Sequence, residues 1–227
     1  MFQASAAVLS RSFLGALLAM AAAWSLAAEP APLVGKVEPL LAQDLAKSVQ
    51  LDARQLQPRP LTDASLLPAD RVAVPLAQTQ PLAILPADSD ISQPEHLQGR
   101  TVCLAEAGGY AGLLQARFGA NEARYPSLPQ ALLALQNGAC DALVHDSAVL
   151  QALVRLPEWK AFNNSFAVGE PRQLAVVLPA SNRAAIAQVR QAASDWQASA
   201  HSEQLAAKVA GRLSEEVRRN QQLATAY

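Results

Sequence analysis

Early in the chain, apolar residues recur with the period of a helix. Further along, segments with a strand-like pattern alternate with segments with a helical pattern. From Val37 to Val49, apolar residues recur at spacings of three and four, which predicts an amphipathic helix. Beyond residue 95, short apolar runs of strand length alternate with helical segments and glycine-containing turns. This alternation is typical of βαβ units with a parallel sheet, so the pattern predicts an α/β fold.

The clearest pattern is QALLALQNGACDALVHD, residues 130–146, in which a leucine-rich helix is ended by Asn137 and Gly138. The apolar run that follows predicts a buried strand ending at Asp146, with another helix starting at Ser147. Open α/β sheets present ligand-binding groups at the carboxyl ends of their strands. Aspartate is also a favoured residue immediately before a helix. The spacing therefore leaves both ligand binding and helix capping open for Asp146.

The remaining elements are predicted from the same patterns. Five prolines break the segment 58–81 and indicate irregular structure, with one strand-like piece at 71–74. Ser181 is expected to cap a helix that carries an apolar stripe, and the tail 202–227 is expected to be helical. Further strands are predicted at 51–56, 81–85, 101–105, 123–127, 139–144, 165–169 and 173–180.

The first 28 residues have the composition of a signal peptide. Arg11 is their only charge, and residues 12–28 are uncharged and rich in alanine and leucine. The small residues Ser25, Ala27 and Ala28 stand where cleavage would occur. A membrane anchor is the alternative, but this apolar stretch is at the short limit for a span. We therefore predict an exported protein whose mature chain starts near Glu29.

Composition and charge narrow the function. Of 227 residues, 51% are hydrophobic and 16% charged, with a net charge of −1, so one large domain or two small lobes are expected. Because no basic stripe is present, nucleic acid is not an expected partner. The two cysteines, Cys103 and Cys140, lack metal-site spacing, and no cofactor is expected. In an exported chain they predict a disulfide between neighbouring strands, with two buried free thiols as the alternative.

Several blocks resemble family 3 periplasmic solute-binding proteins, the receptors of polar amino-acid ABC transporters. The matching blocks are HLQGRTV at 96–102, GGY at 108–110, ALQNGACDALVHD at 134–146 and LAVVLP at 174–179. The resemblance runs from residue 82 to the C-terminus and implies the two-lobed periplasmic-binding-protein type II (Venus flytrap) fold. The first lobe would be residues 29–85 plus 174–227 and the second 86–173. The first lobe is shorter than the family pattern and is expected to be reduced.

The resemblance also implies a binding site for a free amino acid, polar or glutamine-like. Asp146 would hold the α-ammonium group, and backbone N–H groups of the Gly108–Gly109 turn, at a helix N-terminus, would hold the α-carboxylate. Tyr110 is placed beside the ligand, with packing on the helix as its alternative. Arg71 is the remaining candidate for the family's carboxylate-binding arginine, with an exposed loop residue as its alternative. The implied protein is a monomer that serves an inner-membrane ABC permease.

Two other functions stay open at the sequence level. One is a sensor or interaction module that keeps the fold without transport. The other is an enzyme, because some cyclohexadienyl dehydratases share this fold. Glu106 and His145 are expected near the cleft, but they form no recognised acid–base arrangement, so we expect a binding protein and not an enzyme.

Overall fold

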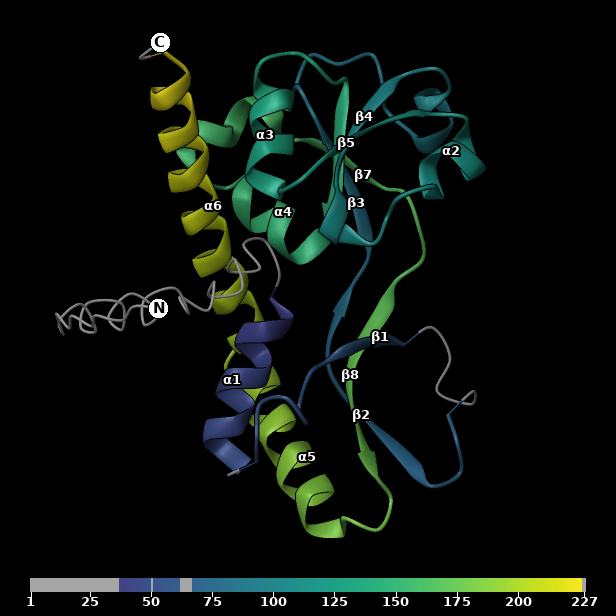
Figure 1. Cartoon of the computed structure of the whole chain (residues 1–227), viewed down its shortest axis with the longest axis vertical. Helices are drawn as coiled ribbons and strands as arrows, with labels where there is room; N and C mark the ends of the chain where they lie inside the picture. The colour runs from purple at the N-terminus through teal and green to yellow at the C-terminus, as the bar shows by residue number, and fades with distance from the viewer. Residues whose placement is uncertain (1–36, 50, 62–66, 226–227) are drawn as a thin grey trace, which may run out of the picture. The chain divides into compact units, whose positions relative to one another are not determined.

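The computed structural model describes residues 37–49, 51–61 and 67–225 (Figure 1). The signal peptide predicted at residues 1–28 lies outside the described residues. Within the described ranges, no helix has the length and apolar character needed to cross a membrane.

The first lobe is built on a small antiparallel sheet. Its strands β1 (Arg59–Leu61), β8 (Arg172–Pro179) and β2 (Arg71–Thr79) lie in the order β1-β8-β2. Helix α5 (Arg183–Ala198) packs on β2, and helix α1 (Glu38–Val49) packs on α5 (Figure 1). The helix expected from the apolar period at 37–49 is thus confirmed.

Strand β2 corrects the prediction that prolines leave the segment 58–81 irregular. The strand runs through Pro75, and its pairing with β8 shifts register between Pro75 and Ala77. Proline lacks a backbone N–H, but an edge strand with a bulge tolerates that loss. The strand predicted at 51–56 is also wrong, because these residues form turns. There the Asp52 carboxylate accepts a hydrogen bond from the backbone N–H of Arg54 (2.8 Å), a side-chain turn that competes with an extended strand.

The second lobe contains a mixed five-stranded sheet. Its order is β5 (Asn121–Tyr125), β4 (Thr101–Ala105), β6 (Ala142–Asp146), β3 (Pro81–Leu85) and β7 (Asn164–Ala167). The predicted parallel pairing holds for β5, β4 and β6, whereas β3 runs antiparallel to both β6 and β7. Every residue of β3 is buried, as expected for an interior strand covered on both faces. Helices α2 (Leu113–Phe118), α3 (Leu128–Gln136) and α4 (Ser147–Leu153) complete the lobe.

The chain crosses between the lobes earlier than the sequence indicated. The segment 81–85, assigned by prediction to the first lobe, is β3 of the second sheet, so the crossing lies at Gln80 and the return lies between β7 and β8. The two crossings are close together. The backbone N–H of Val168 donates to the carbonyl of Pro81 (2.9 Å), and a Cβ on Gly169 would lie 2.7 Å from Pro81 Cγ. Only glycine leaves room for this approach.

The C-terminal helix α6 (His201–Thr225) contacts both lobes, although the sequence assigned it to the first lobe. It packs on α3 and α4 of the second lobe and on α1 and α5 of the first (Figure 1). The residues 157–162 form the short 3-10 helix η4 (Pro157–Phe162), in which Trp159 is fully buried. Its indole Nε1–H donates to Ser214 Oγ of α6 (2.9 Å). Buried polar groups of this kind fix the position of α6 on the second lobe.

Helix ends match the sequence signals with one exception. Ser127 accepts a hydrogen bond from the backbone N–H of Gln130 and caps α3, and Gly138 beyond that helix has a φ of 72°. Helix α5, in contrast, is capped by Asn182 and not by Ser181: the Asn182 carboxamide oxygen accepts from the N–H of Ala185 (3.2 Å). The apolar stripe predicted for α5 is buried as expected.

The disulfide between Cys103 and Cys140 is confirmed, with a Cα–Cα distance of 5.7 Å. Cys103 lies in β4, and Cys140 lies two residues before β6, not inside the strand as the sequence indicated. Strands β4 and β6 are parallel neighbours, with Cys103 opposite Leu143, which brings the two cysteines into bonding range. The disulfide thus joins the two strands that lead to the predicted binding residues.

Candidate functional site

Asp146 stands at the carboxyl end of β6, beside the point where the chain enters the second lobe. It pairs with Pro81 of β3. The next residue, Ser147, donates its backbone N–H to the carbonyl of Gln80 (2.8 Å) and accepts from the N–H of Gln80 through its hydroxyl (3.2 Å). Asp146 precedes α4, but its side chain makes no capping hydrogen bond. The carboxylate instead accepts a hydrogen bond from the hydroxyl of Tyr110.

Tyr110 connects Asp146 to a positive charge. The Tyr110 ring is 3% exposed, meets the ring of His145 edge-on, and lies under the Arg172 guanidinium, whose Cζ is 5.3 Å from the ring centroid. Burial, followed by the negative charge of Asp146, raises the pKa of Tyr110 well above its usual value, while Arg172 opposes this change. The phenol therefore stays protonated and keeps donating to Asp146.

Arg172 and Thr79 face each other at the end of the first sheet. They are paired residues of β8 and β2, and residues directly opposite on neighbouring strands direct their side chains to the same face. Arg172 was not predicted from the sequence, because no motif surrounds it. Its position was the only indication in the sequence: it is a basic residue at the start of the strand that returns to the first lobe.

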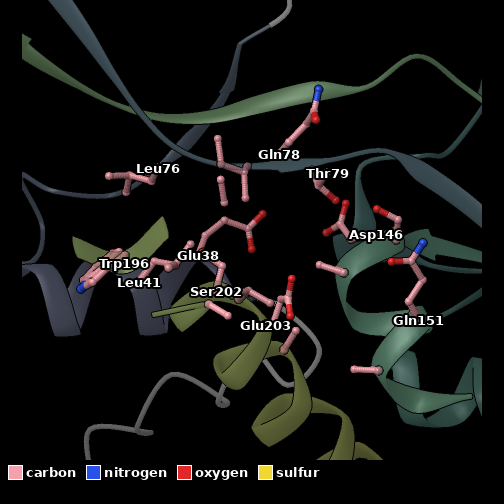
Figure 2. Close-up of a pocket in the computed structure, with 18 of the residues that line it drawn as sticks. Glu38, Leu41, Leu76, Gln78, Thr79, Asp146, Gln151, Trp196, Ser202 and Glu203 are labelled. Atoms are coloured by element: carbon pink, nitrogen blue, oxygen red, sulfur yellow. The ribbon is translucent and has the colours of Figure 1, made fainter. Parts of the chain in front are cut away.

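These residues line a cavity of about 420 Å³, which we call the cleft. Its lining comes from both lobes: Glu38, Pro39, Gln57, Pro58, Pro60, Thr79, Gly108, Gly109, Tyr110, Asp146 and Arg172. A second cavity of about 580 Å³, which we call the side cavity, adjoins it, and Glu38, Thr79 and Asp146 line both. Figure 2 shows the side cavity, with Asp146 and Thr79 next to each other at one side of it. Four of the five predicted binding residues, Gly108, Gly109, Tyr110 and Asp146, are thus brought together in the cleft.

Arg71 is not part of this group. It stands at the opposite end of β2 from Thr79, where it pairs with Pro179, and it lines neither cavity. Its Nε lies 3.8 Å from the carboxylate of Asp70, and both side chains are substantially exposed. Arg71 therefore lies at the end of β2 that is remote from the cleft. Glu106 and His145, the residues considered for an acid–base role, also line neither cavity.

The N–H groups at the start of α2 are occupied by a side chain of the protein. The Glu122 carboxylate accepts hydrogen bonds from the backbone N–H groups of Gly112 (2.7 Å), Leu114 (3.1 Å) and Gln115 (3.2 Å). The side chain of Glu122 is only 3% exposed. These three donors are therefore unavailable to a ligand carboxylate. The Gly108–Gly109 turn, whose N–H groups were predicted to hold that carboxylate, lies before α2 and lines the cleft.

Glu122 should make the stability of the protein sensitive to acid. Burial disfavours its charge, but the hydrogen bonds from Gly112, Gln115, Arg124 and Leu114 outweigh burial and hold its pKa below the usual value. A lowered pKa in the folded state stabilises the protein above the unfolded-state value, and this stabilisation is lost as the pH falls through the folded-state value. Glu122→Gln should lower the free energy of unfolding at pH 7 by about 2 kcal/mol, because it weakens this capping network. Urea unfolding at pH 7 and pH 4 measures the effect.

The matched control is Glu170→Gln, which changes an exposed glutamate in the crossing between β7 and β8. The control should unfold like the parent at both pH values. The difference between the Glu122 variant and the parent should shrink at the lower pH. A difference that is equal at both pH values would contradict the role assigned to the Glu122 charge.

Comparison with known proteins identifies the fold. No protein-family model and no curated protein sequence matches the chain. Among solved structures, a substrate-binding domain assigned to an amino-acid ABC transporter of Streptococcus pneumoniae is similar, with a TM-score of 0.51 and 16% identity over 74% of this chain and 86% of that one. The ligand-binding core of GluR0, in complex with L-glutamate, has a TM-score of 0.53 and 10% identity over 76% and 88% of the two chains.

The chain has the two-lobed Venus flytrap fold. The periplasmic-binding-protein type II fold expected from the sequence blocks is therefore confirmed. The first lobe is reduced, with three strands in its sheet among the described residues. At these low identities the likeness concerns the fold alone.

Proposed function

We propose that this protein binds a free amino acid in the cleft and delivers it to an inner-membrane ABC permease. One observation carries the proposal: Tyr110 contacts both Asp146, through its hydroxyl, and Arg172, through its ring. These contacts lie where the chain crosses between the lobes. A free amino acid has an ammonium and a carboxylate on the same carbon, and this pair of side chains offers one partner to each. A cavity of about 420 Å³ lies within the roughly 300–1,000 Å³ usual for small-molecule sites.

The two charged side chains have distinct roles in this proposal. The Tyr110 hydroxyl occupies Asp146 Oδ1, so Oδ2 remains to accept from the α-ammonium group. Arg172 takes the role that the sequence assigned to Arg71 and donates to the α-carboxylate. Its guanidinium lies against the Tyr110 ring, which restrains it before the ligand arrives and reduces the entropy lost on binding.

The comparison structures agree with a binding role. One is a domain of an amino-acid transporter, and the other holds L-glutamate. We extend this to an exported, monomeric receptor in the periplasm whose ligand favours a closed arrangement of the lobes. A dehydratase activity has no comparable support, because Glu106 and His145 lie outside the cleft.

Titration with a panel of the free amino acids tests the proposal. At least one member at millimolar concentration should raise the Tm, because a ligand at 100 times its Kd stabilises the folded state by about 2.7 kcal/mol. Arg172→Gln should weaken that ligand roughly tenfold to a hundredfold, since the carboxylate loses a charged partner. Differential scanning fluorimetry and isothermal titration calorimetry measure the two effects.

Arg71→Gln is the matched control, since it removes the same charge from the other end of the first sheet. It should bind the ligand like the parent. Loss of binding in the Arg71 variant alone would restore the sequence-based assignment. A panel in which no amino acid changes the Tm would contradict amino-acid binding altogether.

A further inference from the structure

Three carboxylates converge on the side cavity from separate parts of the chain. Glu38 comes from α1, Asp146 from the end of β6, and Glu203 from α6. Figure 2 shows these three side chains around one common space. Among the described residues, the lining includes one cationic residue, Arg155, which is exposed. The tertiary fold thus gathers three acidic groups, which outnumber the basic residues of this described lining.

A buried hydroxyl gives independent evidence for a ligand in the same place. Thr79 is 6% exposed, and its Oγ1 has no hydrogen-bond partner among the described residues. It lines the side cavity and points to the same region as Asp146 (Figure 2). A buried hydroxyl without a partner is costly and rare in folded proteins. An N–H donor on a ligand would provide the missing partner.

We propose that the side cavity binds a second, cationic end of the ligand. The chemistry is an ammonium or guanidinium group on a short aliphatic chain, as in an amino acid with a basic side chain or in an aliphatic diamine. The amino-acid case rests on the function proposed above. Because Glu38, Thr79 and Asp146 line both cavities, one extended ligand reaches from the cleft into the side cavity.

The rest of the lining fits an organic cation. Leu41, Leu76 and Trp196 form an apolar wall on one side of the cavity, suited to methylene groups (Figure 2). Gln151 and Ser202 add neutral hydrogen-bonding groups near the carboxylates. A metal ion is a poorer match, because within the described ranges no three His, Cys, Asp or Glu side chains come close enough together to hold one. Several carboxylates spread around a cavity instead match the several N–H donors of an ammonium or guanidinium group.

Calorimetric titration with L-lysine, L-norleucine and cadaverine tests this inference. Norleucine has the carbon chain of lysine without the side-chain ammonium, and cadaverine lacks the carboxylate. L-Lysine should bind about tenfold or more tightly than L-norleucine, because the carboxylates act only on the added charge. Glu203→Gln should weaken lysine about tenfold and leave norleucine unchanged. Glu215→Gln, an exposed position on the same helix, is the matched control and should leave both affinities unchanged.

The outcomes separate this inference from the proposed function. Equal affinity for lysine and norleucine, or an unchanged ratio in the Glu203 variant, would overturn the cationic subsite and leave amino-acid binding in place. Binding of cadaverine without any amino acid would support the subsite and contradict the proposed function. No binding of any probe would contradict both. Circular-dichroism melts of each variant confirm that it is folded.

Discussion

Replacing Asp146 by asparagine is expected to abolish amino-acid binding while the protein remains folded. Asparagine keeps the shape of the side chain and an oxygen for the Tyr110 hydroxyl, but it removes the charge that faces the α-ammonium group. Losing one partner of a desolvated charge pair typically weakens binding by about a hundredfold or more. The Asp146 side chain caps no helix N–H group, so the Tm without ligand should change little. Calorimetric titration and thermal unfolding measure the two quantities.

Asp88→Asn provides the control, because Asp88 is exposed in the connector after β3 and lines neither cavity. It should bind the ligand as the parent does. If the Asp146 variant keeps its affinity but melts at a lower temperature, the aspartate serves the start of α4 and not the ligand.

Removing the disulfide by the double substitution Cys103→Ala and Cys140→Ala should cause the largest loss of stability. The bond closes a loop with a sequence separation of 37 residues. In the chain-entropy treatment such a loop contributes about 4 kcal/mol to the free energy of unfolding. For a chain of this size the Tm should fall by roughly 8–16 °C. Thermal unfolding followed by circular dichroism measures the shift.

Reductant supplies the internal control for this experiment. It should lower the Tm of the parent towards that of the double variant and leave the double variant unaffected. Both cysteines are buried, so the reductant reaches the disulfide only when the surrounding structure opens. The parent should therefore be incubated with reductant until free thiols are detected. A parent whose Tm is unchanged after complete reduction would show that the loop is held by packing alone.

Elements with a strong local signal were predicted well. The apolar period of α1, the glycine at the end of α3 and the apolar run of β4 specify their structures over a few residues, and the structure contains all three. The position of Asp146 was predicted in the same way, because a strand followed at once by a helix places its last residue at the edge of the sheet.

The disulfide and the parallel pairing of β4 were predicted, but other features that depend on distant pairing were not. Arg71 was predicted to lie near the ligand, but the pairing of β2 with β8 puts Arg172 beside Thr79 and Arg71 at the other end of the strand. Glu122 is an ordinary strand residue in sequence, and only the fold brings its carboxylate to the start of α2. Pro75 was read as a strand breaker because its position on a sheet edge is a property of the whole sheet.

Helix α6 has a consequence for how the two lobes can move. In a Venus flytrap the lobes are joined by the crossing strands, and a change in the angle between them takes place there. In this protein α6 also packs on helices of both lobes. Trp159 of the second lobe donates a hydrogen bond to Ser214 of α6. Any rotation at the crossings must therefore shift one packed face of α6 against its neighbours. Packed helix faces favour discrete positions over a continuous range. The open and closed forms should then differ in which of two discrete packing positions α6 takes against its neighbouring helices. The ligand would act by selecting one of these two positions.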